Sequence, residues 1–162
     1  MRTRIWNNLA NIKFKALYCR LCSKSAGFYG QIYSFLLAFT SAGSVAAWAI
    51  WKEYPSAWAI IVAVAQILHV AKPHIPVLGK ETDFLAMSFD FEKLYLQYER
   101  LWYDFDTEKI IGEEAEALFY QYRERELEIQ RISCPDIARL VRIADRDTKS
   151  ALSLNFETEG EQ

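Results

Sequence analysis

The sequence predicts an all-α protein in which a basic N-terminal helix continues into a two-helix transmembrane hairpin, followed by a cytosolic helical domain. Three observations lead to this prediction. Two apolar segments follow one another with a link of three residues, the first half of the chain is basic, and the second half carries long helical patterns rich in aromatic residues. Small residues repeated along the apolar segments also predict a symmetric oligomer.

The charge is divided unevenly along the chain. Residues 1–80 hold nine Lys or Arg and one acid, a net charge of +8, whereas residues 81–162 hold ten basic and twenty acidic residues, a net charge of −10. Such a division indicates that a membrane or another polyanion lies near the basic half. The acidic half is expected to be solvated and cytosolic.

Residues 1–26 are predicted to form a basic amphipathic helix. Six basic residues and no acid precede position 27, while Ile5, Leu9, Ile12 and Ala16 recur at helical spacing. Two interpretations remain open, since this helix is suited either to packing on the cytosolic helices or to lying on anionic lipid.

Residues 27–78 are predicted to form the transmembrane hairpin. Residues 27–51 carry no charge, and as a helix they would extend over about 37 Å, longer than the ~30 Å hydrocarbon core. Residues 55–71 number seventeen, the lower limit for a span. Six basic residues precede the first span, and Lys72 and Lys80 follow the second. The positive-inside rule therefore places both termini in the cytoplasm.

Small residues mark both predicted spans. Ala38, Ala42 and Ala46 repeat every four positions in the first, and Ala59 and Ala63 do so in the second. Small side chains let membrane helices approach closely. Packing within the hairpin explains at least one stripe, and two stripes also allow self-association.

Polar residues within the hairpin are candidates for lining a pore. Gln66 and His69 are three residues apart on one helix face, and Glu53 lies in the link. The candidate pore-lining set is Glu53, Ala59, Ala63, Gln66 and His69. A hydrogen bond between helices would equally explain Gln66, a position near the inner headgroups would explain His69, and a solvated loop would explain Glu53.

Residues 79–154 are predicted to form three cytosolic helices. The first covers residues 81–105, and the second runs from a cap at Thr107 to about Ile132. The third is expected to be capped by Ser133, with Pro135 and Asp136 in its first turn. Residues 155–162 are predicted to be a disordered acidic tail.

A basic stripe on the third cytosolic helix is the candidate ligand site. Its members fall at i, i+3, i+7 and i+10, and they are Arg139, Arg142, Arg146 and Lys149. Such a stripe is suited to phosphate groups of a nucleotide, an oligonucleotide or lipid heads, and the N-terminal lysines are a second candidate. The alternative is a solvated face laced with aspartates, including an i, i+4 pair of Asp145 and Lys149.

The sequence gives little basis for catalysis. It lacks a glycine-rich phosphate loop, a nucleophile elbow and a Cys/His metal set, so no enzymatic activity, metal or cofactor is expected. Cys19 and Cys22 form a C-x-x-C pair, which we interpret as two small apolar residues on one helix face rather than as a redox pair or half a metal site.

This layout, with its aromatic cytosolic domain and the residues around Trp102–Asp104, resembles the SLATT domain family. Members are two-transmembrane effectors associated with nucleotidyltransferase-dependent antiphage defence. The resemblance implies an oligomeric, pore-forming effector in the bacterial inner membrane. It also implies control by a cyclic nucleotide or DNA oligomer that a partner nucleotidyltransferase makes.

A second resemblance concerns the link. Trp51, Glu53 and Pro55 are similar to the pore-mouth W-D-x-x-E-P signature of mitochondrial calcium uniporters, and this similarity alone favours a tetramer. Tyr54 separates the Glu from the Pro, and the signature's Asp has no counterpart, so calcium selectivity is not implied. Two alternatives to a channel are a membrane-anchored coiled-coil scaffold without a pore and a membrane-embedded enzyme.

Overall fold

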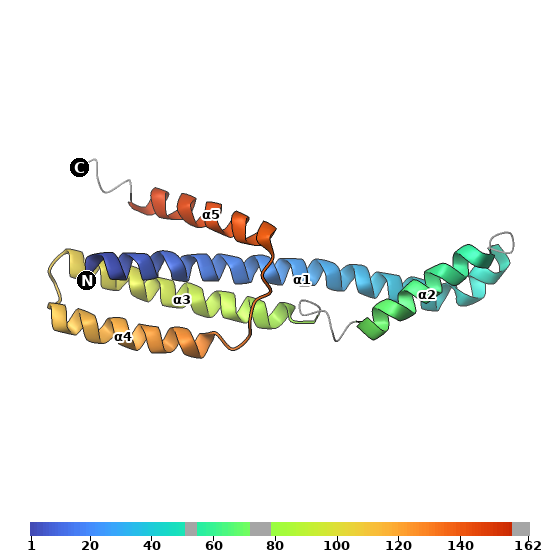
Figure 1. Ribbon diagram of the computed structural model, residues 1–162, viewed down its shortest axis with the longest axis horizontal. Coiled ribbons are helices and arrows are strands. Elements are labelled where there is room, and N and C mark those ends of the chain that lie inside the picture. Colours follow the sequence, from blue (N-terminus) through green and yellow to red (C-terminus); the bar gives the residue numbers. More distant parts are fainter. Residues whose placement is uncertain (51–54, 72–78, 157–162) are drawn as a thin grey trace. The chain divides into compact units, whose positions relative to one another are not determined.

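The structure, a computed structural model, describes residues 1–50, 55–71 and 79–156 (Figure 1). Within these ranges the chain is all-α, as predicted, and contains no strand. The helices are α1 (Arg2–Ile50), α2 (Pro55–Ala71), α3 (Glu81–Asp106), α4 (Gly112–Ile129) and α5 (Ala138–Phe156). They form two compact units, which we call the bundle (Met1–Ser23 with Thr82–Gln162) and the hairpin unit (Lys24–Glu81).

In the bundle, the first part of α1 packs antiparallel to α3. Arg2 pairs with Asp106 at 2.7 Å, and Lys13 pairs with Glu92 at 2.7 Å. The start of α1 therefore lies beside the end of α3, and later residues of α1 lie beside earlier residues of α3. The apolar stripe predicted for the N-terminal helix is fully buried in this contact. The basic N-terminal helix therefore packs on the acidic half of the chain.

The same part of α1 runs parallel to α4. Arg4 approaches the Tyr120 hydroxyl at 3.5 Å, and further along both helices Lys15 donates to Glu126 at 2.6 Å. Glu126 is only 3% exposed and also accepts a hydrogen bond from Arg123 at 2.6 Å. Because this carboxylate lies between two cations, its buried charge is compensated.

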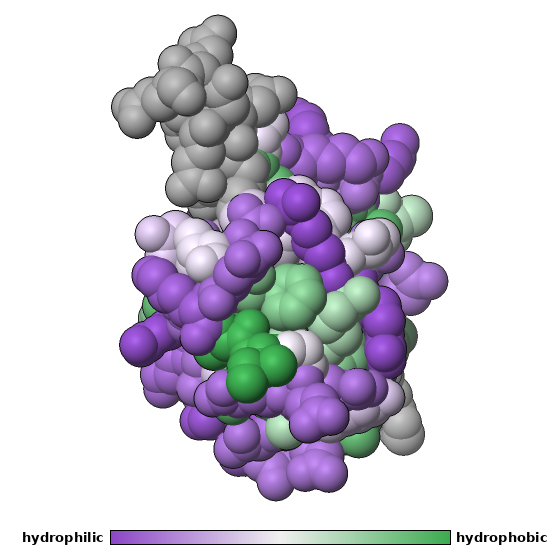
Figure 2. All heavy atoms as spheres, turned by 90° about the vertical axis from the view of Figure 1, so that its left-hand side faces the viewer, coloured by the Kyte–Doolittle hydropathy of each residue, from purple (hydrophilic) through white to green (hydrophobic). Residues whose placement is uncertain are grey.

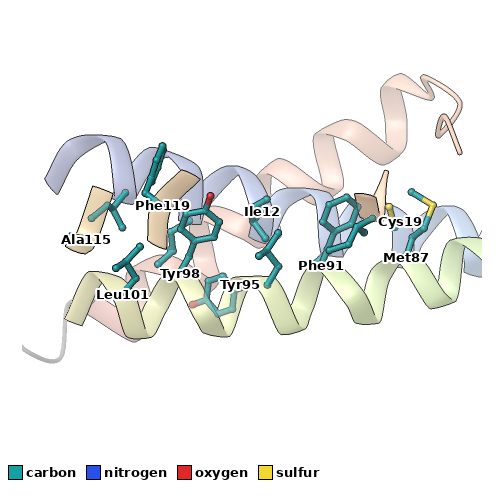
Figure 3. Packing of buried hydrophobic residues seen from close by; sticks show 14 residues of the cluster. Ile12, Cys19, Met87, Phe91, Tyr95, Tyr98, Leu101, Ala115 and Phe119 are labelled. Carbon is teal, nitrogen blue, oxygen red and sulfur yellow. The ribbon is translucent and has the colours of Figure 1, made fainter. Parts of the chain in front are cut away.

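Aromatic side chains form much of the bundle core (Figure 3). Tyr98 on α3 packs edge-to-face against Phe119 and Tyr122 of α4, with ring centroids 6.0 and 5.3 Å apart. Such pairs contribute beyond the area that they bury. The Tyr98 hydroxyl is buried without a hydrogen-bond partner among the described residues, and this burial raises its pKa.

The second of the three helices predicted for residues 79–154 begins later than predicted. Thr107 does not cap it, because its hydroxyl donates to the Tyr103 carbonyl at the end of α3. Glu108 then adopts a left-handed backbone with φ of 55°, which ends α3, and α4 begins at Gly112 without a side-chain cap. The helix also ends at Ile129 rather than near Ile132.

The third of these helices also differs from the prediction at both ends. Ser133, Pro135 and Asp136 precede α5, which begins at Ala138. The Tyr18 hydroxyl of α1 donates to the Pro135 carbonyl and accepts a hydrogen bond from the Ile137 amide at 3.1 Å, so it holds this segment out of the helix. At its other end α5 continues through Phe156, two residues into the predicted tail, whose remaining residues 157–162 lie outside the described part.

The two units differ in what covers them. Viewed from one end, the bundle is covered largely by hydrophilic side chains, with hydrophobic ones gathered near the middle (Figure 2). In the hairpin unit, Tyr33 of α1 and Ala65 of α2 are buried, while nine large apolar side chains are 47–73% exposed. No helix in the described ranges is both long enough and apolar enough to cross a membrane.

Candidate functional site

Helix α2 presents three distinct faces. At about 100° per residue, Ala59, Ala63 and Gln66 fall within an arc of about 60°, and all three are exposed. The bulky residues next to them form a second exposed face, made of Ile60, Val64 and Ile67. Ala65 lies on a third side and is 2% exposed. Over residues 59–67, α2 therefore separates a small and polar face from a bulky apolar face, while Val70, 70% exposed, lies in line with the first of these faces one turn further along the helix.

The part of α1 in the hairpin unit carries a matching apolar face. Phe28, Ile32, Phe35 and Phe39 recur at helical spacing and are 48–73% exposed. Phe35 and Phe39 stack with ring centroids 6.5 Å apart. Tyr33 is buried on the other side of the helix. The large apolar residues of both hairpin helices thus point away from the contact between them.

A hydrogen bond links the two hairpin helices. The Tyr33 hydroxyl of α1 lies 2.8 Å from Nδ1 of His69 on α2. Since His69 remains exposed while making this contact, it lies at the margin of the α1–α2 contact. A polar contact within the hairpin is a specific role for His69 that the sequence pattern did not indicate.

The predicted pore-lining residues are only partly brought together. Ala59, Ala63 and Gln66 share one exposed face of α2, and His69 lies beside it, engaged with Tyr33. Glu53 lies outside the described residues, as do the side chains of Ala42 and Ala46 from the first small-residue stripe. What the described part offers is therefore a short small-and-polar face on α2.

The basic stripe on α5 is exposed along its whole length. Two of its four members have aspartate partners: Arg146 contacts Asp147 at 3.3 Å, and Lys149 contacts Asp145 at 2.8 Å. The Arg142 side chain donates to the Ala138 carbonyl at 3.4 Å. The stripe is accessible to a phosphate group, and the predicted pair of Asp145 and Lys149 also forms.

The N-terminal lysines are less suited to ligand binding. Lys13 pairs with Glu92 and lies over the Tyr95 ring, 4.3 Å from its centroid, while Lys15 pairs with the buried Glu126. Both cations are therefore used inside the bundle.

Helix α3 carries an exposed apolar stripe that the sequence analysis did not single out. Leu85, Phe89, Leu96 and Tyr103 are separated by four, seven and seven residues and are 38–59% exposed. A seven-residue repeat keeps side chains on one seam of a helix, as in coiled coils. The spacing of these large apolar residues, which sets them apart from the buried face of α3, is the sequence signal that could have revealed this stripe.

The cysteines are arranged differently from the sequence interpretation. Cys19 and Cys22 are buried on α1 as small residues, but Cys134 from the α4–α5 connection joins them, with its Sγ 3.4 Å from Cys19 Sγ. The sequence did not indicate that Cys134 joins this pair, because it is 115 positions from Cys19. No group of three metal-ligating side chains suited to an ion occurs in the part of the chain that the structure describes.

Comparison with known proteins adds no relative. No family model, curated protein sequence or solved structure matches this chain. The functional argument therefore depends on the residues and geometry given above.

Proposed function

We propose that this chain is the subunit of an oligomeric membrane channel whose hairpin unit enters the bilayer and whose bundle lies in the cytoplasm. The observation that carries this proposal is the nine large apolar side chains that the hairpin unit leaves 47–73% exposed. Removing such side chains from water contributes about 1.5–3 kcal/mol each when burial is complete. Exposed apolar surface on this scale is typical of contact with a membrane or another apolar partner.

The length of α2 bears on how the hairpin would sit in lipid. Its 17 residues extend over about 26 Å, a few ångströms less than a ~30 Å hydrocarbon core. A bilayer adapts to a short segment by local thinning, at a cost of a fraction of a kcal/mol per ångström. The proposed insertion therefore involves a locally thinned bilayer around α2.

The small-and-polar face of α2 is the proposed pore-lining surface. Ala59 and Ala63 leave space, Gln66 offers hydrogen bonds to water, and Ile60, Val64 and Ile67 would face lipid. Glu53 and His69 remain the proposed polar ends of this face.

The apolar stripe on α3 supports self-association. Its seven-residue spacing suits a helix seam between copies of this chain, and this would hold the bundles together around the pore. A tetramer is favoured only by the similarity of the link to calcium uniporters.

The SLATT resemblance extends the proposal to biological role. In that extension the channel is an antiphage effector of the bacterial inner membrane that opens and damages the host membrane. Its ligand is a cyclic nucleotide or oligonucleotide made by a partner nucleotidyltransferase, and it binds the α5 stripe through its phosphates. The exposure of Arg139, Arg142, Arg146 and Lys149 is the structural support for this step.

A scaffold that uses the hairpin only as an anchor is the second candidate. The completeness of the bundle core favours it, because a self-contained cytosolic module needs no pore to act as an adaptor. Replacing residues 27–78 by an unrelated hairpin distinguishes the two functions. A scaffold keeps its activity after this exchange, whereas a channel loses it.

Ion flux in liposomes tests the channel directly. Ala63→Phe fills the proposed lumen and should strongly reduce flux, whereas the matched control Ile60→Phe, on the lipid-facing side of α2, should leave flux close to the unchanged protein. Equal effects of the two substitutions, or no flux with any nucleotide-derived ligand, would contradict the channel.

Nucleotide binding tests the regulatory step separately. Arg142→Glu should weaken binding of a cyclic dinucleotide or short oligonucleotide, and raising the salt concentration should do the same. Arg125→Glu, on an exposed part of α4, is the matched control for charge reversal. Binding that survives Arg142→Glu unchanged would identify the stripe as a solvated face.

A further inference from the structure

Three thiols that are far apart in the sequence meet inside the bundle. Cys19 and Cys22 lie one turn apart on α1, and Cys134 lies in the connection between α4 and α5. The Cys134 Sγ is 3.4 Å from the Cys19 Sγ, within sulfur hydrogen-bond distance, and it also interacts with Cys22. The packing therefore places one thiol of the connection against two thiols of α1.

This position of Cys134 is fixed by neighbouring contacts. The Tyr18 hydroxyl, one residue before Cys19, donates to the Pro135 carbonyl and accepts from the Ile137 amide at 3.1 Å. These two hydrogen bonds join α1 to both sides of the peptide segment that follows Cys134. The approach of Cys134 to Cys19 is thus part of how the connection is held on α1.

A small molecule can reach the Cys19 and Cys134 thiols through a cavity of about 210 Å³. Its lining includes Cys19, Cys134, Lys15 and Met87. Cys134 is partly exposed, while Cys19 and Cys22 are buried. A hydroperoxide that enters this cavity would meet Cys134 as the most accessible sulfur.

The electrostatics of the cluster separate the roles of the thiols. Hydrogen bonds from Cys19 and Cys22 hold the pKa of Cys134 well below its usual value. The same interaction with Cys134, together with burial, raises the pKa of Cys19 and of Cys22. Since the thiolate is the nucleophile, Cys134 is suited to attack an oxidant, and Cys19 to respond afterwards as a thiol.

We propose that Cys134 and Cys19 form a peroxide-responsive pair that closes a reversible disulfide between α1 and the α4–α5 connection. The Cys134 thiolate attacks one oxygen of a hydroperoxide, and the O–O bond breaks. The peroxide is reduced by two electrons and, after taking a proton from solvent, leaves as water or an alcohol, while Cys134 is oxidised to a sulfenic acid.

The second step closes the disulfide. Cys19 sulfur attacks the sulfenic sulfur of Cys134, and the S–O bond breaks. The departing hydroxide takes up the proton from the Cys19 thiol and leaves as water, so that a Cys19–Cys134 bond remains. A dithiol reductant restores both thiols by exchange. The bond would fix the segment that leads into α5, and with it the start of the basic stripe.

Oxidation of the full chain with hydrogen peroxide in detergent tests this pair. Denatured thiol counting should show the loss of two of the three thiols, and peptide mapping should find one intramolecular Cys19–Cys134 disulfide that dithiothreitol reverses. Three free thiols after this treatment, a disulfide between two chains, or a Cys22–Cys134 bond would overturn the proposal.

Single substitutions separate the two roles. Cys134→Ser should slow peroxide consumption at least about tenfold, because the reactive thiolate is lost. Cys19→Ser should leave a sulfenic acid at Cys134 that dimedone traps, and Cys22→Ser, which keeps a hydrogen-bond donor beside Cys134, should still form the Cys19–Cys134 disulfide. Circular dichroism verifies that each variant is folded. Unchanged peroxide consumption in folded Cys134→Ser would overturn the assignment.

Discussion

The bundle and the hairpin unit contain similar aromatic and aliphatic side chains but use them in opposite ways. In the bundle Phe84, Phe91 and Tyr98 are at most 1% exposed, whereas in the hairpin unit Phe28 and Phe35 are 61% and 73% exposed. Among the described residues, α1 contacts three other segments in the bundle, namely α3, α4 and the α4–α5 connection, and it contacts α2 in the hairpin unit. A single helix pair can bury only one face of each helix, so the remaining apolar faces need another environment.

Truncating one phenylalanine in the bundle gives the largest expected effect. Phe91→Ala should lower the free energy of unfolding by about 3–5 kcal/mol, because it removes a fully buried ring and leaves a cavity. Chemical denaturation of the full chain in detergent, followed by circular dichroism, measures this change. Leu127→Ala, at a 73% exposed apolar residue of α4 outside the α3 stripe, is the control and should change stability by less than about 0.5 kcal/mol.

Removing the buried carboxylate of the bundle comes next. Glu126→Ala should destabilise the bundle by about 3 kcal/mol, since it leaves the cations of Lys15 and Arg123 without their shared partner. The same denaturation experiment measures it, and Glu124→Ala, an exposed neighbour on α4, is the control. Equal effects at positions 126 and 124 would show that the buried network does not stabilise the contact between α1 and α4.

The corresponding truncation in the hairpin unit should affect a different property. Phe35→Ala should leave the unfolding of the bundle unchanged and weaken partitioning of the protein into phospholipid vesicles by about 1.5–3 kcal/mol. Vesicle flotation at varied lipid concentration measures the partitioning. A loss of bundle stability with no change in partitioning would contradict the contrast between the two units.

The smallest expected effect is a gain in stability. Glu108 has a left-handed backbone with φ of 55°, which glycine adopts more easily, so Glu108→Gly should stabilise the bundle by about 0.5–1 kcal/mol. The same substitution inside α4, Glu116→Gly, should cost about 1 kcal/mol because glycine is a poor helix former. Thermal denaturation measures whether Glu108→Gly raises the stability of the bundle and Glu116→Gly lowers it.

Several features could be predicted because they depend on local patterns. Helical periodicity and the absence of glycine and proline predicted α3 from Glu81 almost to its end, and the stripe of Ile5, Leu9, Ile12 and Ala16 identified the buried face of α1. The spacing of Ala59, Ala63 and Gln66 likewise places them on one face, whatever that face contacts.

Features that join distant residues were not predictable in this way. Helix starts at Thr107 and Ser133 followed sound capping rules, yet the Tyr103 carbonyl and the Tyr18 hydroxyl took the hydrogen bonds that would have supported those starts. The partner of Lys15 and the position of Cys134 likewise depend on which helices pack together.

The sequence by itself determined the helical class, the division of charge and the apolar faces of the individual helices, because each depends on residues within a few turns of one another. Only the tertiary structure decided that the basic N-terminal helix packs between acidic partners, that Tyr33 meets His69, and that three distant thiols share one place. These contacts join residues 36 to 115 positions apart, and no local pattern specifies which of the many helix pairings brings them together.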